Sequence, residues 1–360
     1  MTAMRIAQIA PLYESVPPVG YGGTERVIAA ICEGLVGLGH DVTLFATGSS
    51  TTPARLEAMA PSPLRTRYSR AEMIDLAPHV HLRMLAEVYS RADEFDLIHS
   101  HLDVWTLPFA QNCRTPTVLT MHGRLDLEHV RQTLPLYPGA NLVSISNHQR
   151  RAVSDIPVQW AGTVYNGLNL DNYLMASRPD RTDYLAFVGR IHPEKGPESA
   201  VAIARRARLP LRVAAKIDPL DIDYYTGRVE PLFRANSVDF IGELSERDKP
   251  SFFAGARATL FPSDWPEPFG LVMIESLAAG TPVVALRRGS VPEILVDGVT
   301  GFICDDIDEM IEAVRRVDQI DPEDCRRRAM QFDTSSMCAG YERVYDAFVR
   351  TDLGEAVRHT

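Results

Sequence analysis

The chain has 360 residues, a formal net charge of −10, 23% charged residues and 45% hydrophobic residues. This length allows two domains of ordinary size, and this balance is typical of a folded globular protein rather than a disordered one. The acidic charge argues against nucleic acid as the main partner, because a surface that binds a phosphate backbone must be basic.

The first half of the chain alternates short apolar runs with helical periods. A strand is predicted at 5–12, followed by a Gly-rich loop at 20–23 and a helix that Thr24 can cap and Gly39 can end. Further strands are predicted at 41–46, 96–101, 117–122 and 141–146. Each of these strands is separated from the next by a segment that can form a crossover helix.

The same alternation then starts again in the second half. A strand is predicted at 184–189 and a helix at 194–207, with further strands at 211–215, 238–242, 258–262 and 282–286. Strands that alternate with helices form parallel sheets covered on both faces. The sequence therefore predicts an α/β protein with two Rossmann-like, doubly wound domains.

The domain boundary is placed at the polar stretch that begins at residue 172. We expect an N-terminal domain at 1–171, joined by a terminal helix at 335–360, and a C-terminal domain at 172–334. Ligands of open parallel sheets bind beyond the carboxyl ends of the strands. Two such domains predict one cleft between them, lined by strand-to-helix loops.

Cysteine usage and hydropathy predict a cytoplasmic protein. The five cysteines are scattered and form no C-x-x-C pair, which is typical of free thiols in a reducing compartment. No apolar run approaches the ~18 residues of a membrane span, and no signal-peptide pattern precedes the first strand. Arg65, Arg67 and Arg70 are interpreted as a solvated face, with a membrane-binding patch as the alternative.

Two cations follow the first strand of the predicted C-terminal domain. Arg190 ends this strand, and Lys195 lies near the first turn of the next helix. A planar guanidinium, a compact ammonium and the positive end of a helix dipole together suit a diphosphate. Lys216, at the end of the next strand, is a candidate third phosphate cation; a pair with Asp218 or simple exposure are the alternatives.

Two glutamates lie in the segment 265–282. Gly270 allows the backbone to approach a ligand where the predicted helix begins. Glu275 falls among apolar residues of this helix, so its carboxylate needs partners, which the vicinal hydroxyls of a ribose would supply. Glu267, in the loop before the helix, can reach the hydroxyls of a bound sugar. A buried Glu275 that pairs with an arginine or caps a neighbouring helix is the alternative.

In this order, the motifs resemble those of family 4 of the retaining glycosyltransferases, which have the GT-B fold. The matching segments cover almost the whole chain: Tyr21-Gly22-Gly23-Thr-Glu-Arg26, Asp96-Leu-Ile-His-Ser-His101, Thr120-Met-His122-Gly123, Ser144-Ile-Ser146, Tyr165-Asn166-Gly167, Gly189-Arg190 with Lys195-Gly196, and Glu267-x7-Glu275. The Glu-x7-Glu helix with the upstream arginine and lysine is specific in combination. One segment departs from the family: the Gly-rich turn of many members is replaced by Ala214-Ala-Lys216-Ile-Asp-Pro219.

The resemblance implies a role for each matching residue of the C-terminal domain. Arg190 and Lys195 would neutralise the diphosphate of a nucleotide-sugar donor, and Glu275 would bind its ribose. Glu267 would bind hydroxyls of the transferred sugar. The remaining contacts would come from the backbone: Phe269, Gly270 and Leu271 near the sugar, and Gly242, Glu243 and Leu244 at the base.

The resemblance also assigns residues of the N-terminal domain. Gly22 and Gly23 would close over the donor phosphates, and His122 would lie beside the reacting carbon. His101 and Asn166 are further candidates on matching segments. The His99-x-His101 pair is interpreted as lining the cleft rather than as metal ligands, because no third ligand is evident.

Together these assignments predict a retaining transfer of a hexose from a nucleotide sugar to a hydroxyl of a small-molecule acceptor. The fixed cations would stabilise the leaving diphosphate, so no metal or other cofactor is expected. The Asp-x-Asp strings at 221–223 and 306–308 are explained as charges at helix N-termini. UDP-glucose or a related UDP-sugar is the favoured donor, and GDP-mannose is the alternative.

Three other functions use a similar fold or similar motifs. A nicotinamide dehydrogenase fits poorly, because Gly20-Tyr-Gly22-Gly-Thr-Glu25 lacks the third glycine and the second strand ends without an acidic residue. A sugar-nucleotide epimerase of the same fold and a non-catalytic sugar-nucleotide-binding protein are the two remaining alternatives. The sequence predicts no oligomeric state.

Overall fold

The computed structural model describes residues 2–20, 22–175 and 183–356. It divides the chain into two compact units, the first formed by Met1–Leu168 with Thr334–Thr360 and the second by Asn169–Asp333. Tyr21 of the first Gly-rich loop, and most of the polar stretch at the expected domain boundary, lie outside the described residues.

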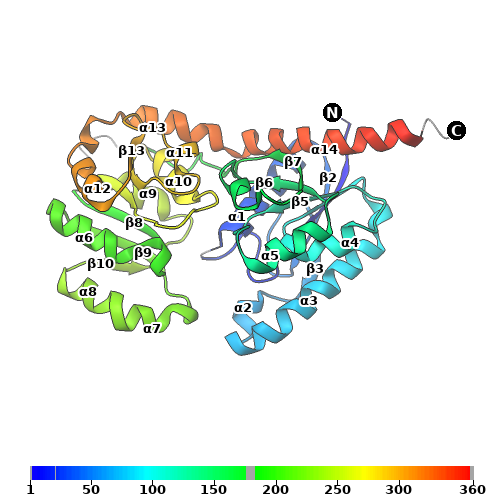
Figure 1. The fold of residues 1–360 in the computed structure, drawn as a ribbon, viewed down its shortest axis with the longest axis horizontal. Helices are drawn as coiled ribbons and strands as arrows, with labels where there is room; N and C mark the ends of the chain where they lie inside the picture. Colours follow the sequence, from blue (N-terminus) through cyan, green and yellow to red (C-terminus); the bar gives the residue numbers. More distant parts are fainter. Residues whose placement is uncertain (1, 21, 176–182, 357–360) are drawn as a thin grey trace. The chain divides into compact units, whose positions relative to one another are not determined.

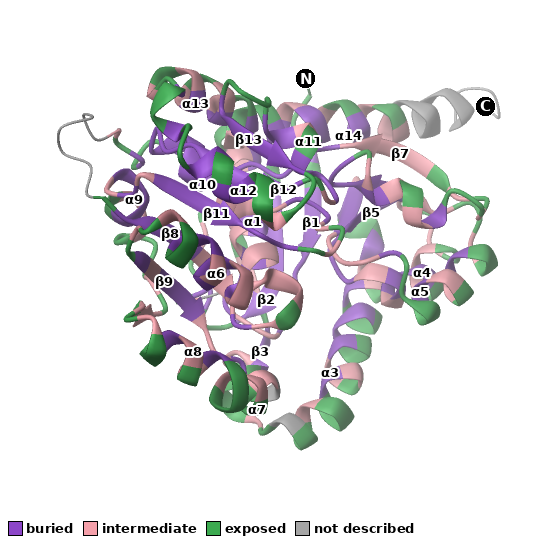
Figure 2. Cartoon of the chain, turned by 60° about the vertical axis from the view of Figure 1, so that its left-hand side comes forward, coloured by how far each residue is buried: buried purple, intermediate pink, exposed green. Residues whose placement is uncertain are grey.

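The first unit is built on a seven-stranded sheet with the order β3-β2-β1-β4-β5-β6-β7 (Figure 1). All neighbouring strands are parallel. The strands are β1 (Arg5–Ile9), β2 (Asp41–Thr47), β3 (Arg55–Ala60), β4 (Leu97–Ser100), β5 (Thr117–Met121), β6 (Asn141–Ser144) and β7 (Gln159–Thr163). Figure 2 shows that the central strands are buried, whereas the helices expose their outer faces. Apolar side chains from β1, β2 and β4 pack against α3 in one core cluster.

The helices of the first unit differ widely in length. The longer helices are α1 (Gly23–Gly37), α3 (Arg70–Ser90) and α14 (Thr334–Ala356). Short α-helical turns are α2 (Leu64–Arg67), α4 (Leu107–Ala110) and α5 (Glu128–Thr133), and short 3-10 turns are η1 (Ala92–Glu94), η2 (Asp103–Thr106), η3 (Leu134–Leu136) and η4 (Gln149–Val153). The terminal helix α14 contacts α1 and β7, and it buries Met337, Tyr341 and Tyr345.

The second unit repeats the parallel architecture with six strands in the order β10-β9-β8-β11-β12-β13. The strands are β8 (Leu185–Arg190), β9 (Leu211–Lys216), β10 (Asp239–Gly242), β11 (Ala258–Phe261), β12 (Val283–Leu286) and β13 (Gly301–Cys304). The helices are α6 (Pro197–Ala207), α7 (Ile222–Tyr224), α8 (Glu230–Ala235), α9 (Lys249–Ala254), α10 (Leu271–Ala278), α11 (Val291–Ile294), α12 (Ile307–Val314) and α13 (Pro322–Ala329), with the short turns η6 (Pro193–Lys195), η7 (Pro219–Asp221), η8 (Tyr225–Val229), η9 (Val317–Gln319) and η10 (Met330–Phe332). The prediction of two parallel, Rossmann-like sheets is confirmed.

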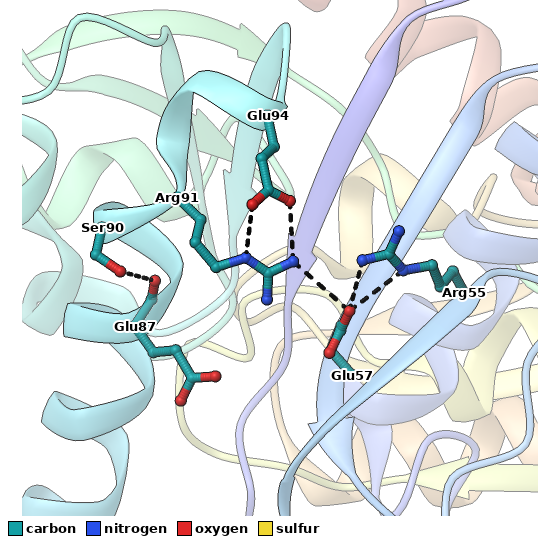
Figure 3. Close-up of polar contacts among 6 residues, drawn as sticks. All are labelled: Arg55, Glu57, Glu87, Ser90, Arg91 and Glu94. Atoms are coloured by element: carbon teal, nitrogen blue, oxygen red, sulfur yellow. Dashed lines mark hydrogen bonds and ion pairs between the residues drawn. The ribbon is translucent and has the colours of Figure 1, made fainter.

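Every predicted strand is present, but β3, β7 and β13 were not predicted. β3 is an edge strand whose sequence, Arg55-Leu-Glu-Ala-Met-Ala60, carries charges and no β-branched residue. Figure 3 shows those charges: Arg55 and Glu57 lie beside Arg91, which forms two hydrogen bonds with Glu94, both 2.9 Å long. Charges on an edge strand discourage its pairing with another chain. The same charges make the sequence of β3 resemble that of a loop, which is why the strand was not predicted.

Two local predictions about helix starts were wrong. Helix α1 begins at Gly23 with Gly22 as its N-cap residue, so Thr24 lies inside the first turn and does not cap it. The helix expected to begin at residue 194 begins at Pro197, because Gly196 has a left-handed conformation with φ 73° and separates the turn η6 from α6. The prediction that the cysteines remain thiols is confirmed, since none of the five forms a disulfide. Within the described part of the chain, no helix has both the length and the apolar character required to cross a membrane.

Candidate functional site

The order of the second sheet collects the predicted cations at one edge. Strands β8 and β9 are neighbours in parallel register, and Arg190 and Lys216 are paired Cα positions at their carboxyl ends. The backbone N–H of Ile191 donates to the carbonyl of Lys216 at 2.8 Å, which fixes the loop after β8 against β9. Strands β10 and β11 flank this pair of strands, so the loops that follow all four strands leave the same edge of the sheet.

The loop after β8 is held against the end of β11. A Cβ atom built on Gly196 would lie 2.4 Å from the carbonyl oxygen of Pro262, so this close approach requires glycine. The Ser263 hydroxyl also donates to the carbonyl oxygen of Glu194 at 3.0 Å. Lys195 lies between these two contacts and is therefore fixed beside the loop that carries Glu267.

Lys195, in the loop after β8, forms an ion pair with Glu267, in the loop after β11. The Lys195 ammonium hydrogen-bonds Oε2 of Glu267, and it also lies 5.0 Å from the centre of the Trp265 ring. The two side chains are 17% and 15% exposed, so neither is a freely solvated surface charge. The structure thus brings together two residues that the sequence had assigned to one site.

The backbone of Glu267 is held by the loop after β12, which sequence reasoning missed. Gly289 has φ 55°, and a Cβ atom there would lie 2.3 Å from the carbonyl oxygen of Glu267. The backbone N–H of Ser290 donates to that oxygen at 3.0 Å, and the Ser290 hydroxyl donates to the carbonyl of Phe269 at 2.6 Å. The sequence signal for this support is the Gly289-Ser290 dipeptide, which two residues separate from the end of a buried strand.

Arg190 also has an acidic neighbour. Its Nε lies 3.5 Å from Oδ2 of Asp221, and the other carboxylate oxygen of Asp221 lies 3.8 Å from Nε2 of His192. Asp221 is the N-cap residue of α7, which confirms its explanation as a charge at a helix N-terminus, although its side chain makes no capping hydrogen bond. The explanation is also confirmed for Asp306, whose side chain caps α12 by accepting from the N–H of Glu309. Asp221 follows the turn that departs from the family pattern.

Helix α10 presents its N-terminus in the same region. Gly270 is its N-cap residue, with φ 86°, and no side chain of the described residues caps it. The first N–H groups of a helix have no partner within the helix, so this end of α10 can donate hydrogen bonds to a ligand. Leu271 begins the helix, whereas the Phe269 side chain is buried and can contribute only its backbone.

Glu275 is buried on α10, with 1% of its surface exposed. The Tyr173 hydroxyl donates to its Oε1 at 2.6 Å, and the Lys249 ammonium lies 3.5 Å from the same oxygen. The predicted need for partners is therefore met within the protein, where a tyrosine and a lysine contact the carboxylate. No pattern in the sequence indicated either Tyr173 or Lys249.

The predicted base-binding turn follows β10. Gly242 ends this strand with φ 74°, and a Cβ atom there would meet open space. Glu243 is exposed and Leu244 is half-buried. The turn therefore offers backbone groups and one apolar side chain beside the edge that carries Arg190 and Lys216.

The predicted residues of the first unit follow β4 and β5. Nδ1 of His101 lies 2.8 Å from Nε2 of the half-buried His122, and Nε2 of His101 lies 2.9 Å from Oε1 of Gln8. His99 and His101 are buried side by side, with ring centres 4.1 Å apart. The expectation that they line a cleft was wrong: their rings are parts of a buried hydrogen-bond network. Burial lowers the pKa of both rings well below the ordinary value and that of His122 to about 4.

Asp103 lies beside His122 and was missed in the sequence. It has a left-handed backbone with φ 45°, a conformation that a non-glycine residue adopts only where the surroundings impose it. Its Oδ1 is buried without a hydrogen-bond partner among the described residues. Burial raises the pKa of this carboxyl to about 6, although the backbone N–H of His122 donates a hydrogen bond to it. No sequence signal distinguishes this aspartate from those at ordinary turns.

The other candidates of the first unit are the paired glycines and Asn166. A Cβ atom on Gly22 would lie 2.8 Å from Cγ of Pro18, so a side chain there would displace the preceding loop. Gly23 is the first residue of α1. Asn166 is buried, and its Oδ1 has no hydrogen-bond partner in the described part of the chain. Within that part, no cluster of three or more His, Cys, Asp or Glu side chains could hold a metal ion.

Comparison with known protein families gives one match for each half of the chain. Residues 21–172 match the model described as Glycosyltransferase Family 4. Residues 176–331 match the model described as Glycosyl transferases group 1. The two matches together span most of the described residues of both units.

Individual proteins resemble the chain over most of its length. It is 27% identical to a glycogen synthase of Mycobacterium tuberculosis, over 96% of this chain and 95% of that protein. It is 28% identical to a D-inositol 3-phosphate glycosyltransferase of Thermobifida fusca, over 79% of this chain and 77% of that protein. Among solved structures, the Anabaena protein HepE in complex with UDP and glucose superposes with a TM-score of 0.73 at 19% identity, over 96% of this chain and 100% of that one.

Proposed function

The chain belongs to the family 4 glycosyltransferases of the GT-B fold, and from that premise we propose that it transfers a hexose from a nucleotide sugar to a hydroxyl acceptor with retention of configuration. The observation that carries this proposal is the gathering of charged side chains at the carboxyl ends of β8 and β9. Arg190 and Lys216 are paired there, and the fixed loop after β8 adds Lys195 beside Glu267.

The cations would bind the donor diphosphate and stabilise it as the leaving group. When the bond between the anomeric carbon and the diphosphate oxygen breaks, negative charge develops on the diphosphate and positive charge on the sugar. Arg190 and Lys195 are held near acidic partners, so phosphate oxygens would take the place of Asp221 and Glu267 around them. Positioned cations stabilise such charge without reorganisation, and for this reason the proposal includes no metal ion.

The sugar and the ribose would be bound by the two glutamates. Glu267, once released from Lys195, would accept hydrogen bonds from sugar hydroxyls next to the uncapped N-terminus of α10. Glu275 would accept from the ribose hydroxyls, in addition to its bond from Tyr173. A carboxylate has roughly four lone-pair positions, so it can hold these donors together.

His122 and Asp103 would act on the sugar and the acceptor. A half-buried imidazole with a lowered pKa is neutral at ordinary pH and can exchange hydrogen bonds with hydroxyl groups. The buried Oδ1 of Asp103 requires a donor, and an acceptor hydroxyl would supply it. This assignment makes the region after β4 and β5 the acceptor side of the reaction.

A UDP-sugar is the donor that we favour, with GDP-mannose as the alternative. The turn at Gly242 would contact the base largely through backbone groups, so it would select weakly among bases. The Anabaena protein with the same fold holds UDP and glucose, which supports the choice of a uridine nucleotide. A UDP-hexose is therefore the first donor to test.

The test begins with nucleotide binding in the presence of EDTA. A ligand that binds only the folded protein raises its melting temperature, so UDP and UDP-glucose should do so, whereas NAD should not. The Arg190→Ala variant should lose this shift. Arg234→Ala is the matched control, because Arg234 forms an exposed pair with Glu230 within α8. Stabilisation by NAD alone would overturn the proposal.

Product analysis separates the alternatives. UDP-glucose with a panel of hydroxyl acceptors should yield UDP and a glycoside, and proton NMR of the fresh product should show an α-linkage. Conversion of UDP-glucose into an isomeric UDP-sugar without acceptor would instead identify an epimerase. Tight UDP-glucose binding with neither product would favour the non-catalytic binding protein.

A further inference from the structure

A continuous hydrogen-bond chain joins the terminal helix α14 to His122. The Tyr345 hydroxyl on α14 lies 3.4 Å from Nε2 of Gln8 on β1. The other end of that amide, Oε1, lies 2.9 Å from Nε2 of His101, and Nδ1 of His101 lies 2.8 Å from Nε2 of His122. Tyr345, Gln8 and His101 are buried behind His122, which is the half-buried end of the chain.

A second branch fixes the other side of Tyr345. Its hydroxyl lies 2.7 Å from Nδ1 of His99, and Nε2 of His99 lies 2.7 Å from the hydroxyl of Thr120. The Thr120 hydroxyl in turn lies 3.0 Å from the hydroxyl of Tyr341 on the same helix. Two tyrosines of α14 therefore close a network that contains two buried histidines.

Proton counting gives this chain a direction. A neutral imidazole has one N–H and one acceptor nitrogen, and an amide has a donor end and an acceptor end. Because Gln8 presents Oε1 to His101, Nε2 of His101 carries the proton and its Nδ1 must accept. Nε2 of His122 must then donate to it, which leaves Nδ1 of His122 without a proton. A reversed Gln8 amide would reverse each of these assignments.

We infer that Tyr345, Gln8 and His101 are positioning residues that hold His122 in the Nε2–H tautomer, with Nδ1 presented as an acceptor to a substrate hydroxyl. Tyr345 supports this orientation of the Gln8 amide because its hydroxyl accepts from Nε2 of Gln8. The contact of His122 with substrate rests on the proposed function, whereas the tautomer does not. The terminal helix would thus determine whether His122 accepts or donates a hydrogen bond.

Nitrogen-15 NMR of the full-length protein, labelled at histidine, tests the tautomer directly. The long-range proton–nitrogen spectrum should show Nε2 of His122 protonated and Nδ1 unprotonated, with the signals assigned by loss in a His122→Asn variant. In Tyr345→Phe the Gln8 amide loses its partner, so the two His122 nitrogen shifts should move toward each other. Gln8→Met removes both ends of the amide and should do the same while Tyr345 is retained.

Tyr89→Phe is the matched control. The Tyr89 hydroxyl lies 3.1 Å from the Thr117 hydroxyl on β5, outside the hydrogen-bond chain that leads to His122. The His122 nitrogen shifts of Tyr89→Phe should therefore equal those of the native protein. A native His122 protonated at Nδ1, or His122 shifts that do not change in both Tyr345→Phe and Gln8→Met, would overturn the inference.

Kinetics then separate this inference from the proposed function. With UDP-glucose as donor, Tyr345→Phe and Gln8→Met should lower kcat by about tenfold and leave the KM for the donor unchanged, since a misoriented group affects the reacting geometry rather than diphosphate binding. Altered tautomer shifts with unchanged kcat would support the positioning chain and remove His122 from the reaction. Unchanged tautomer shifts with lowered kcat would overturn the positioning chain and leave the proposed function intact.

Discussion

The ammonium of Lys195 and the carboxylate of Glu267 form an ion pair although the two residues are 72 positions apart in the chain. Both side chains are largely shielded from water, and each neutralises the other. The same arrangement recurs at Arg190 with Asp221 and at Glu275 with Lys249. The charges proposed to bind the donor are therefore balanced within the protein, and the donor would have to exchange partners with them.

Lys195→Ala should weaken UDP binding by at least about tenfold, because a charge-assisted hydrogen bond contributes roughly 1.5–3 kcal/mol. Titration calorimetry with UDP measures this change. The control is Arg206→Ala, which removes an exposed cation of α6 paired with Asp308. Lys195→Ala also leaves the Glu267 carboxylate without its ion-pair partner, which should lower the free energy of unfolding. In Lys195→Ala/Glu267→Gln this carboxylate is neutralised, so part of that free energy of unfolding should return. Equal UDP affinities of native protein and Lys195→Ala would contradict the site.

Asp221→Asn should strengthen UDP binding. The carboxylate of Asp221 competes with phosphate oxygens for Arg190, and a partly exposed pair contributes roughly 0.3–1 kcal/mol. We expect a two- to fivefold lower dissociation constant, with a smaller gain at high salt because such pairs are screened. Weaker binding would instead show that Asp221 orients Arg190 for the diphosphate.

Gly289→Ala should displace Glu267, because the added Cβ would lie 2.3 Å from the Glu267 carbonyl oxygen and the residue has φ 55°. The expected cost is roughly 1–3 kcal/mol of unfolding free energy, together with a raised KM for the donor sugar. Gly298→Ala is the matched control, since Gly298 has φ 73° but open space at its Cβ position. Urea unfolding and donor kinetics of both variants separate the clash from the backbone strain. If the two variants behave alike, the contact with Glu267 has no part in the effect.

Asp103→Asn should stabilise the protein at neutral pH. Folding raises the pKa of this carboxyl from 3.8 to about 6, so its contribution is fully present below pH 3.8 and is lost as the pH rises through about 6. The asparagine side chain does not ionise, so the variant does not lose this stability as the pH rises. The melting temperature of Asp103→Asn should therefore exceed that of the native protein at pH 7.5 but not at pH 3.5. Asp93→Asn, at an exposed position, is the control. Catalytic turnover should fall in Asp103→Asn if the carboxylate binds the acceptor. A lower melting temperature at pH 7.5 would contradict the description of Oδ1 as unpaired.

Local patterns were enough to predict the fold. Apolar runs such as Asp41-Val-Thr-Leu-Phe-Ala46 and the apolar stripe of the terminal helix appear in the order of the chain, and both domains repeat the strand–helix alternation. The missed strands β3 and β7 lie at the edges of the first sheet and β13 at an edge of the second. β3 and β7 are half-exposed, so their composition differs little from that of loops, whereas β13 is a buried strand of four residues that begins at a glycine.

The residue types of the candidate site were also visible in the sequence, because Arg190, Lys195, Glu267 and Glu275 follow recognisable spacings at strand ends and on one helix. The interaction partners of these residues were not visible in the sequence. The contacts of Asp221 with Arg190 and of Gln8 with His101 connect segments that are adjacent only after the sheets form. Strand order decides which loops share an edge, and burial decides which charges must be paired. The sequence by itself determined the two folds and the chemical groups available, while the tertiary structure alone decided which groups are paired and how the imidazole of His122 is oriented, because those contacts depend on residues far apart in the chain.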